Sequence, residues 1–338
     1  MSEPFSETGQ AGGETGESCE SGEPREPREP REPGGSGESG AETRCGFVAL
    51  VGAPNAGKST LLNTLVGQKL SIVSPKVQTT RRRVLGIATA GRSQLIFVDT
   101  PGIFAPKRRL DRAMVAAAWQ GAGDADLVVV LVDASSGKVD EDSTGLIAKL
   151  KEERRQAILA LNKIDLIRRD RLLALSARLN EDGVFTETFM ISALTGNGVG
   201  DLSKLLAARV PSGPWHFPED QLSDMPMRLL AAEITREKLF LQLYQELPYS
   251  STVETETWEE FKDGSVRISQ VIFVERDSQR AIVIGKGGAR IRSLGESSRR
   301  ELEELLERRV HLKLFVKVRE DWTDDPERYR EMGLDFTP

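Results

Sequence analysis

Between residues 47 and 209, short apolar runs alternate with longer segments whose apolar residues recur at helical spacing. Several of the apolar runs lack the apolar–polar alternation of a strand with one face in water, so we expect strands that are buried on both faces. Strands that alternate with helices predict an α/β fold with a doubly wound, mostly parallel sheet. The predicted strands are 47–51, 84–88, 95–98, 127–132, 157–161 and 188–191, and the predicted helices are 58–66, 111–121, 141–153, 169–181 and 199–209.

The pattern changes after residue 210. Residues 211–218 hold three prolines and a glycine, which predicts an interdomain linker over 211–224. This linker separates a first domain over 45–210 from a smaller α+β domain over 225–338. In the smaller domain the apolar spacing predicts an α-β-β-α-α-β order, with a helix over 225–243, strands over 252–261 and 265–275, helices over 278–284 and about 291–306, and a strand over 311–318.

Composition separates the first 44 residues from this body. The chain of 338 residues has a formal net charge of −6, but residues 1–44 hold eleven glutamates and four arginines and carry −7. The rest of the chain is therefore close to neutral. The prolines of the repeat over 23–33 interrupt any helix, and large apolar residues are almost absent, which predicts a disordered acidic tail. A solvated tail is favoured over a docking peptide.

Several protein classes are disfavoured. No run of 18 apolar residues is present to span a bilayer, and the N-terminus lacks the basic and apolar regions of a secretory signal. Cys19 and Cys45 make no disulfide framework, and two cysteines with two distant histidines do not suit a structural zinc site. These features predict a cytoplasmic protein.

A phosphate-binding pattern, G-x-x-x-x-G-K-[ST], follows the first predicted strand and opens the first predicted helix. That context directs backbone N–H groups and the positive end of the helix dipole at a phosphate. Lys58 is expected to reach the β- and γ-phosphates and Ser59 to hold Mg²⁺. The nucleotide-binding residues predicted here are Gly52, Ala53, Pro54, Asn55, Ala56, Gly57, Lys58, Ser59 and Thr60.

Three further segments follow predicted strands, at the edge where α/β sheets bind ligands. Asp165 can accept hydrogen bonds from both donors of guanine, a pair that adenine lacks, which favours GTP over ATP. Asp99 is expected to belong to the Mg²⁺ shell and the Gly102 amide to contact the γ-phosphate. The predicted residues are Asp99, Thr100, Pro101, Gly102 and Ile103 near the γ-phosphate, and Asn162, Lys163, Ile164, Asp165, Ser192, Ala193 and Leu194 around the base.

In this order and spacing, the four elements resemble the translation-factor-related class of P-loop GTPases. The resemblance implies a switch threonine that binds Mg²⁺ in the GTP state, and it is matched by Gln78, Thr79, Thr80, Arg81 and Arg82. We favour Thr80, and Thr79 stays open. The implied Mg²⁺ ligands are Ser59, Thr80 and Asp99, and the implied catalytic residues are Lys58 and Thr80.

The same resemblance bears on the rate of hydrolysis. Ile103 stands where Ras-like relatives carry a glutamine that orients the attacking water, so we expect slow intrinsic hydrolysis. Asn55 resembles the residue that some members of this class use to bind K⁺. A loop-capping role for Asn55 has equal weight.

The smaller domain contains a G-x-x-G turn between two predicted helices, where a nucleic-acid backbone can approach closely. Basic residues follow it, as expected of a surface that contacts phosphates. With the predicted element order, this segment resembles a type II KH domain, a binder of single-stranded RNA. The predicted RNA-binding residues are Gly285, Lys286, Gly287, Gly288, Arg290 and Arg292.

Taken together, residues 45–338 resemble the Era family of bacterial ribosome-assembly GTPases, also through segments 233–239, 246–250 and 310–312. The resemblance implies a monomer that binds GTP or GDP, Mg²⁺, the 3′ end of 16S rRNA and the 30S subunit, with peripheral association with the inner membrane. One alternative is an RNA-binding module for which GTP is a structural ligand. Another is a membrane-associated signalling GTPase, which the lack of an apolar anchor or lipidation motif disfavours.

Overall fold

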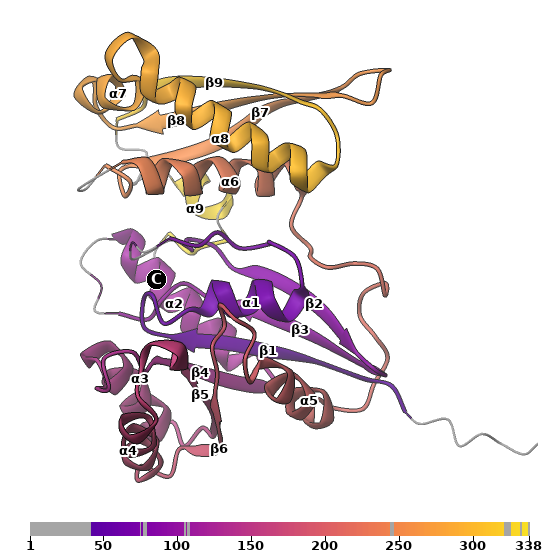
Figure 1. Ribbon diagram of the computed structural model, residues 1–338, viewed down its shortest axis with the longest axis vertical. Helices are drawn as coiled ribbons and strands as arrows, with labels where there is room; N and C mark the ends of the chain where they lie inside the picture. Colours follow the sequence, from indigo (N-terminus) through magenta and orange to yellow (C-terminus); the bar gives the residue numbers. More distant parts are fainter. Residues whose placement is uncertain are drawn as a thin grey trace, which may run out of the picture. The chain divides into compact units, whose positions relative to one another are not determined.

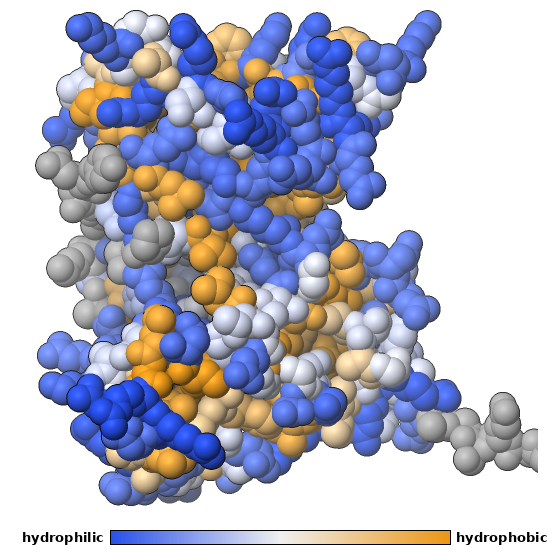
Figure 2. All heavy atoms as spheres, viewed as in Figure 1, coloured by the Kyte–Doolittle hydropathy of each residue, from blue (hydrophilic) through white to orange (hydrophobic). Residues whose placement is uncertain are grey.

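The computed structural model describes residues 42–74, 76, 80–104, 106, 109–243, 247–320, 326–331 and 333–336 (Figure 1). Gln78 and Thr79 of the predicted switch lie outside the described residues, as does the predicted tail up to residue 41. Within the described part, no helix is both long and apolar enough to cross a membrane. On the face drawn in Figure 2, apolar residues form separate areas among hydrophilic ones.

A six-stranded sheet forms the centre of the first domain. Its strands lie in the order β2-β3-β1-β4-β5-β6, and all neighbouring pairs are parallel except β2 and β3. Only Gly91 and Arg92 join β2 to β3, and so short a connection can form a hairpin but not a parallel crossover. The strands are β1 (Arg44–Gly52), β2 (Val84–Ala90), β3 (Ser93–Asp99), β4 (Leu127–Asp133), β5 (Ala157–Asn162) and β6 (Phe185–Met190).

Helices cover both faces of this sheet. Helices α1 (Lys58–Val66) and α5 (Val199–Arg209) cover one face, while α2 (Arg109–Gly123), α3 (Glu141–Glu152) and α4 (Arg169–Asn180) cover the other. In β1, Val48 and Leu50 pack towards the first pair, and Ala49 and Val51 pack towards the other three. Burial on both faces explains the missing apolar–polar alternation, and the predicted doubly wound α/β fold is confirmed.

The second domain has the predicted α-β-β-α-α-β order. Its elements are α6 (Met227–Gln242), β7 (Ser251–Glu260), β8 (Val266–Val274), α7 (Asp277–Ile284), α8 (Ala289–Leu306) and β9 (Val310–Val318). In the sheet β7-β8-β9, β7 and β8 are antiparallel and β8 and β9 are parallel. Helices α6 and α8 pack on one face of it (Figure 1).

The predicted linker is fastened to the first domain. The side-chain amide of Gln94 donates to the Phe217 carbonyl at 2.8 Å, and the Ser223 hydroxyl donates to the Leu85 carbonyl at 2.6 Å. At the other boundary, β1 begins at Arg44, one residue before the predicted start of the first domain. The described residues from Glu42 onward form one compact unit that includes this linker.

The sequence pattern did not predict the short helix α9 (Pro326–Glu331) near the end of the chain. Tyr329 and Leu334 are buried against Ala113 and Met114 of α2. The segment that follows the second domain therefore packs on the helix that follows the Asp99 loop.

Candidate functional site

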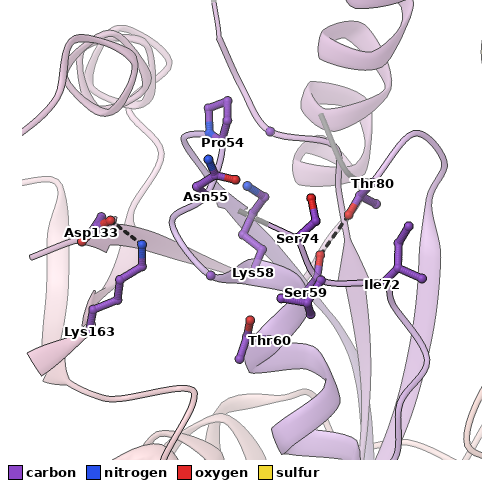
Figure 3. Close-up of a pocket in the computed structure, with 13 residues that line it drawn as sticks. Pro54, Asn55, Lys58, Ser59, Thr60, Ile72, Ser74, Thr80, Asp133 and Lys163 are labelled. Carbon is purple, nitrogen blue, oxygen red and sulfur yellow. Dashed lines mark hydrogen bonds and ion pairs between the residues drawn. The ribbon is translucent and has the colours of Figure 1, made fainter. Parts of the chain in front are cut away.

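A cavity of about 480 Å³ lies at the carboxyl-terminal edge of the first sheet. It brings together the predicted phosphate loop, Thr80, Gly102 and Lys163, with Asp133 and residues 72–74, which the sequence did not single out. Figure 3 shows the Lys163–Asp133 pair across the cavity from Ser59 and Thr80. The lining residues are Pro54, Asn55, Gly57, Lys58, Ser59, Thr60, Ile72, Val73, Ser74, Thr80, Gly102, Asp133 and Lys163.

Asn162 joins three of the predicted segments. Its side-chain nitrogen donates to the Ala56 carbonyl at 2.8 Å, and its side-chain oxygen accepts from the Ala193 amide at 2.9 Å. Gly57, with φ of +100°, makes room for this contact, because a Cβ there would lie 2.2 Å from Nδ2 of Asn162. One buried amide side chain therefore holds the phosphate loop, the base loop and the 192–194 segment together.

Lys58 is held over the phosphate loop. Its Nζ donates to the carbonyls of Gly52 and Ala53 at 3.0 and 2.9 Å. Burial lowers the pKa of Lys58 to about 8, and the nearby Asp99 carboxylate limits the fall. A bound phosphate would favour the charged form and could replace the carbonyl oxygens as acceptor.

Asp99 is the buried acceptor at which the predicted metal ligands converge. Its Oδ2 accepts from Ser59 Oγ at 2.8 Å and from Thr80 Oγ1 at 3.4 Å, and the two hydroxyl oxygens are 2.9 Å apart. Burial raises the pKa of Asp99, while Lys58 and the hydroxyl donors oppose the rise. Asp99 Oδ1 is buried with no hydrogen-bond partner among the described residues. Three hard oxygen ligands with one unsatisfied carboxylate oxygen fit Mg²⁺.

Two residues of this network belong to no motif. Ser71 Oγ donates to Asp99 Oδ2 at 2.8 Å, so that a third hydroxyl group, after those of Ser59 and Thr80, reaches the same carboxylate. Asn63, on α1, accepts from the Leu70 and Ser71 amides at 2.9 Å each. No spacing in the sequence distinguishes Ser71 or Asn63, because only the folded path of the loop brings them to the site.

Of the predicted base-binding residues, Lys163 lines the cavity, whereas Asp165 and Leu194 do not. Asp165 is exposed in a one-turn 3₁₀ helix (Ile164–Leu166), and Leu194 is 80% exposed. Lys163 Nζ lies 2.5 Å from Asp133 Oδ2. Burial by itself would raise the pKa of Asp133, but the hydrogen bonds from Lys163 and Ser135 lower it overall.

The segment that follows β3 lies against the phosphate loop. The Ile103 amide donates to the Gly52 carbonyl at 3.1 Å, and a Cβ at Gly102 would lie 3.0 Å from Pro54. The Ile103 side chain is buried in the core on the α2 side. A buried alkyl group provides no hydrogen bond with which to orient a water molecule.

The described switch residues have different partners. Thr80 faces Ser59, whereas the Arg81 guanidinium donates to the carbonyls of Pro248 and Ser251 in the second domain at 3.1 and 2.9 Å. Burial lowers the pKa of Arg81 to about 9, with a further contribution from nearby Arg236. Neighbouring residues of one loop therefore connect the cavity to the second domain.

The G-x-x-G turn joins α7 to α8 as a single 3₁₀ turn (Lys286–Gly288). Gly285, with φ of +73°, sits so close to α8 that a Cβ would lie 2.8 Å from the Arg290 Cβ. Helix α8 begins immediately after the turn, so its N-terminal amides flank the turn.

Intramolecular contacts engage several of the cations near this turn. Arg290 donates to the Ile282 carbonyl at 2.7 Å, and Arg300 pairs with Glu296 at 2.5 Å. Lys286 and Arg292 are exposed and have no ion pair with any described residue. The two are therefore better placed for phosphate contacts than Arg290.

Comparison with known proteins decides the family. GTPase Era of Bradyrhizobium sp. strain BTAi1 is 65% identical over 297 residues, covering 88% of this chain and 96% of the relative. GTPase Era of Brucella suis is 61% identical over 295 residues, covering 87% and 94%. The chain belongs to the GTPase Era family.

Family models and solved structures of Era agree with the two domains. Residues 47–163 match a model described as 50S ribosome-binding GTPase, and residues 246–323 match a KH domain model. Era of Aquifex aeolicus bound to GDP and AlF4⁻ is 40% identical with a TM-score of 0.81, covering 86% of this chain and 99% of that one. Era bound to MgGDPNP and nucleotides 1506–1542 of 16S ribosomal RNA is 39% identical with the same TM-score and coverage.

Proposed function

We propose that this GTPase is a nucleotide-dependent switch whose KH domain binds the 3′ end of 16S rRNA during assembly of the 30S subunit. The observation that carries the proposal is the convergence of Ser59, Thr80 and Asp99 beside a phosphate loop, in a chain that also presents the 285–288 turn. The Era structure with MgGDPNP and a 16S rRNA fragment supports both halves of the proposal.

In the proposed nucleotide site, the chain's own residues bind and orient GTP. Backbone amides of residues 52–59 and the Lys58 ammonium would surround the phosphates, and the exposed Asp165 carboxylate would accept from the two guanine donors. Asn162 keeps the loops that bind the phosphates and the base at a fixed separation. Selectivity for guanine and affinity for the phosphates would then both depend on loops that the buried Asn162 side chain joins.

Ser59, Thr80 and Asp99 would hold Mg²⁺, which neutralises charge on the β- and γ-phosphate oxygens when bound. The remaining contribution of the protein is positioning, without a covalent intermediate. Because Ile103 is buried and apolar, no side chain at that position orients the attacking water, and slow intrinsic turnover is expected. Asn55 lines the cavity, and we propose that it contributes to a K⁺ site there.

The decisive experiment measures GTP turnover and RNA binding by the full chain. We expect phosphate release that requires Mg²⁺, is faster in K⁺ than in Na⁺, and is lost in Thr80→Ala. An RNA with the 3′ end of 16S rRNA should bind with different affinities in the GTP-analogue and GDP states. GTP binding without turnover, with or without this RNA, would instead favour an RNA-binding module in which GTP is structural.

The proposed setting is cytoplasmic, with the protein acting as a monomer that associates peripherally with the inner membrane. Sedimentation with anionic vesicles and equilibrium ultracentrifugation test these points separately. Vesicle binding that persists after removal of residues 225–338 would favour the alternative of a membrane-associated signalling GTPase.

A further inference from the structure

Glu237, a residue of α6, belongs to no nucleotide-binding motif, yet it contacts the loop between α1 and β2. That loop carries Ser71 and Thr80 to Asp99. We propose that Glu237 is a positioning residue for GTP hydrolysis, because it holds this loop in the arrangement that brings Ser71 and Thr80 to the carboxylate. The inference rests on the proposed GTPase function and extends it to a residue of the second domain.

Both carboxylate oxygens of Glu237 contact residues of the loop. Oε1 accepts from the Val73 amide at 2.8 Å, and Oε2 lies 2.6 Å from Lys69 Nζ. The Glu237 side chain is only 5% exposed, and Lys238 and Glu301 complete a network of two ammonium and two carboxylate groups around it. A buried charge-assisted contact of this kind is stronger than an exposed ion pair and fixes direction as well as distance.

Two cations of the same loop are held by backbone carbonyls of the second domain. Lys76 Nζ donates to the carbonyls of Phe240 and Leu243, at the C-terminal end of α6, where the helix dipole favours a positive charge. Arg81 donates to carbonyls within residues 248–251. The loop is therefore attached to α6 and the segment after it at several points, and the Glu237 carboxylate accepts hydrogen bonds from Lys69 and Val73 of the loop.

The attachment at Glu237 lies close to the nucleotide side of the loop. The Val73 amide donates to the Glu237 carboxylate. Val73 is only two residues after Ser71, whose hydroxyl donates to Asp99. Asn63 fixes the Leu70 and Ser71 amides from α1, so the Ser71 hydroxyl lies between one support from the first domain and one from the second. Removing the second support leaves the backbone directly after Ser71 without this contact, while Lys76 and Arg81 still attach the loop further along the chain.

The consequence should be selective for the triphosphate state. Ser71 and Thr80 donate to Asp99, where the proposed Mg²⁺ and the γ-phosphate would be bound, whereas GDP would be held by the phosphate loop and the base loop, and Glu237 has no hydrogen bond to the described residues of either loop. Apolar residues of α6 such as Leu239 and Ile234, and not Glu237, form the core of the second domain. Loss of Glu237 should therefore weaken binding of GTP analogues and hydrolysis more than binding of GDP.

The test compares Glu237→Ala and Glu237→Gln with the control Glu296→Ala in the full chain. Glu296 is an exposed residue of α8 that pairs with Arg300 at 2.5 Å. The measurements are kcat and KM for GTP, Kd for GDP and for a non-hydrolysable GTP analogue, and the thermal midpoint. Glu237→Ala should lower kcat and analogue affinity by about 5–20-fold, within the usual range of coupling between sites, and leave the Kd for GDP within about twofold.

Glu237→Gln should recover part of the loss, because its amide oxygen still accepts from the Val73 amide. Unchanged kcat and analogue affinity in Glu237→Ala would overturn the inference. So would an equal loss of GDP and analogue affinity together with a lower thermal midpoint, since that result indicates general destabilisation. If the unmodified protein lacks turnover, the proposed GTPase function fails, and the ratio of the two nucleotide affinities still decides the role of Glu237.

Discussion

Replacing Asn162 with alanine tests whether one side chain unites the nucleotide site. The substitution removes the hydrogen bond from Nδ2 to the Ala56 carbonyl and the one from the Ala193 amide to Oδ1. Both backbone partners belong to residues that are 1% exposed, so water does not readily replace the lost contacts. The phosphate loop and the 192–194 segment would each retain an unsatisfied polar group.

The size of the effect follows from those two groups. An unsatisfied buried donor or acceptor costs about 1–3 kcal/mol, so the free energy of unfolding should fall by about 3 kcal/mol. For a domain of this size that corresponds to a thermal midpoint lower by about 6–12 °C. Nucleotide affinity should fall by at least about tenfold for GTP and GDP alike, because both span the phosphate loop and the base loop.

Asn180→Ala provides the matched control. Asn180 also makes two side-chain hydrogen bonds, to the Ser176 carbonyl at 2.8 Å and from Thr188 Oγ1 at 3.0 Å, but it lies at an exposed position of α4. Its replacement should change the free energy of unfolding by less than about 0.5 kcal/mol. Calorimetry and titration with fluorescent GDP and GTP analogues measure both effects. Equal midpoints and affinities in the two variants would refute the linking role of Asn162.

Three other outcomes are expected. Asp165→Asn should weaken GTP binding and favour xanthosine nucleotides, because the donor–acceptor match to the purine is reversed; unchanged preference in competition assays would remove Asp165 from the base site. Charge reversal at Lys286 and Arg292 should lower RNA affinity and flatten its dependence on salt concentration. Reversal at Arg300, which is paired with Glu296, should have a smaller effect on both, and equal salt slopes in all variants would remove Lys286 and Arg292 from the RNA-binding surface. Burial lowers the pKa of Lys58 to about 8, so above that pH the free protein must take up a proton to bind GTP through the charged ammonium. The affinity for GTP should therefore fall about tenfold between pH 7 and pH 9, and an affinity that does not change with pH would contradict this.

The apolar pattern predicted each strand of the two sheets and each helix that packs on them, with bounds within a few residues of those in the structure. It succeeded because burial on both faces of β1 and its neighbours leaves a signal that depends only on local sequence. Helix α9 was missed, since its six residues are too short for a periodic signal and its position depends on contact with α2. The 211–224 segment was predicted as a linker from its prolines, but its attachment to Gln94 and Leu85 depends on the tertiary structure.

The candidate site divides in the same way. Residues that act through the backbone or through a fixed motif, such as Lys58 and Asp99, could be placed from the sequence because their spacing is set by a strand, a loop and a helix. Ser71 reaches Asp99 only through the folded path of the α1–β2 loop, and a serine in a polar loop has no distinguishing pattern. Arg292 and Arg300 look equivalent in the sequence, but only the structure shows that Glu296 neutralises Arg300.

Two separate contacts between the domains reach the parts of the nucleotide site that a γ-phosphate would order. The α1–β2 loop, which carries Thr80, is held by Glu237 and by the carbonyls that Arg81 contacts. Helix α2, which follows the Asp99 loop, packs against Tyr329 after the last strand of the KH domain. The loop contact is made by charged and polar groups, whereas the α2 contact is apolar, so a substitution at Glu237 should weaken the first and leave the second unchanged. A loss of nucleotide-dependent RNA binding in Glu237→Ala at constant salt, with the α2 contact intact by hydrogen exchange, would therefore assign the coupling to the loop.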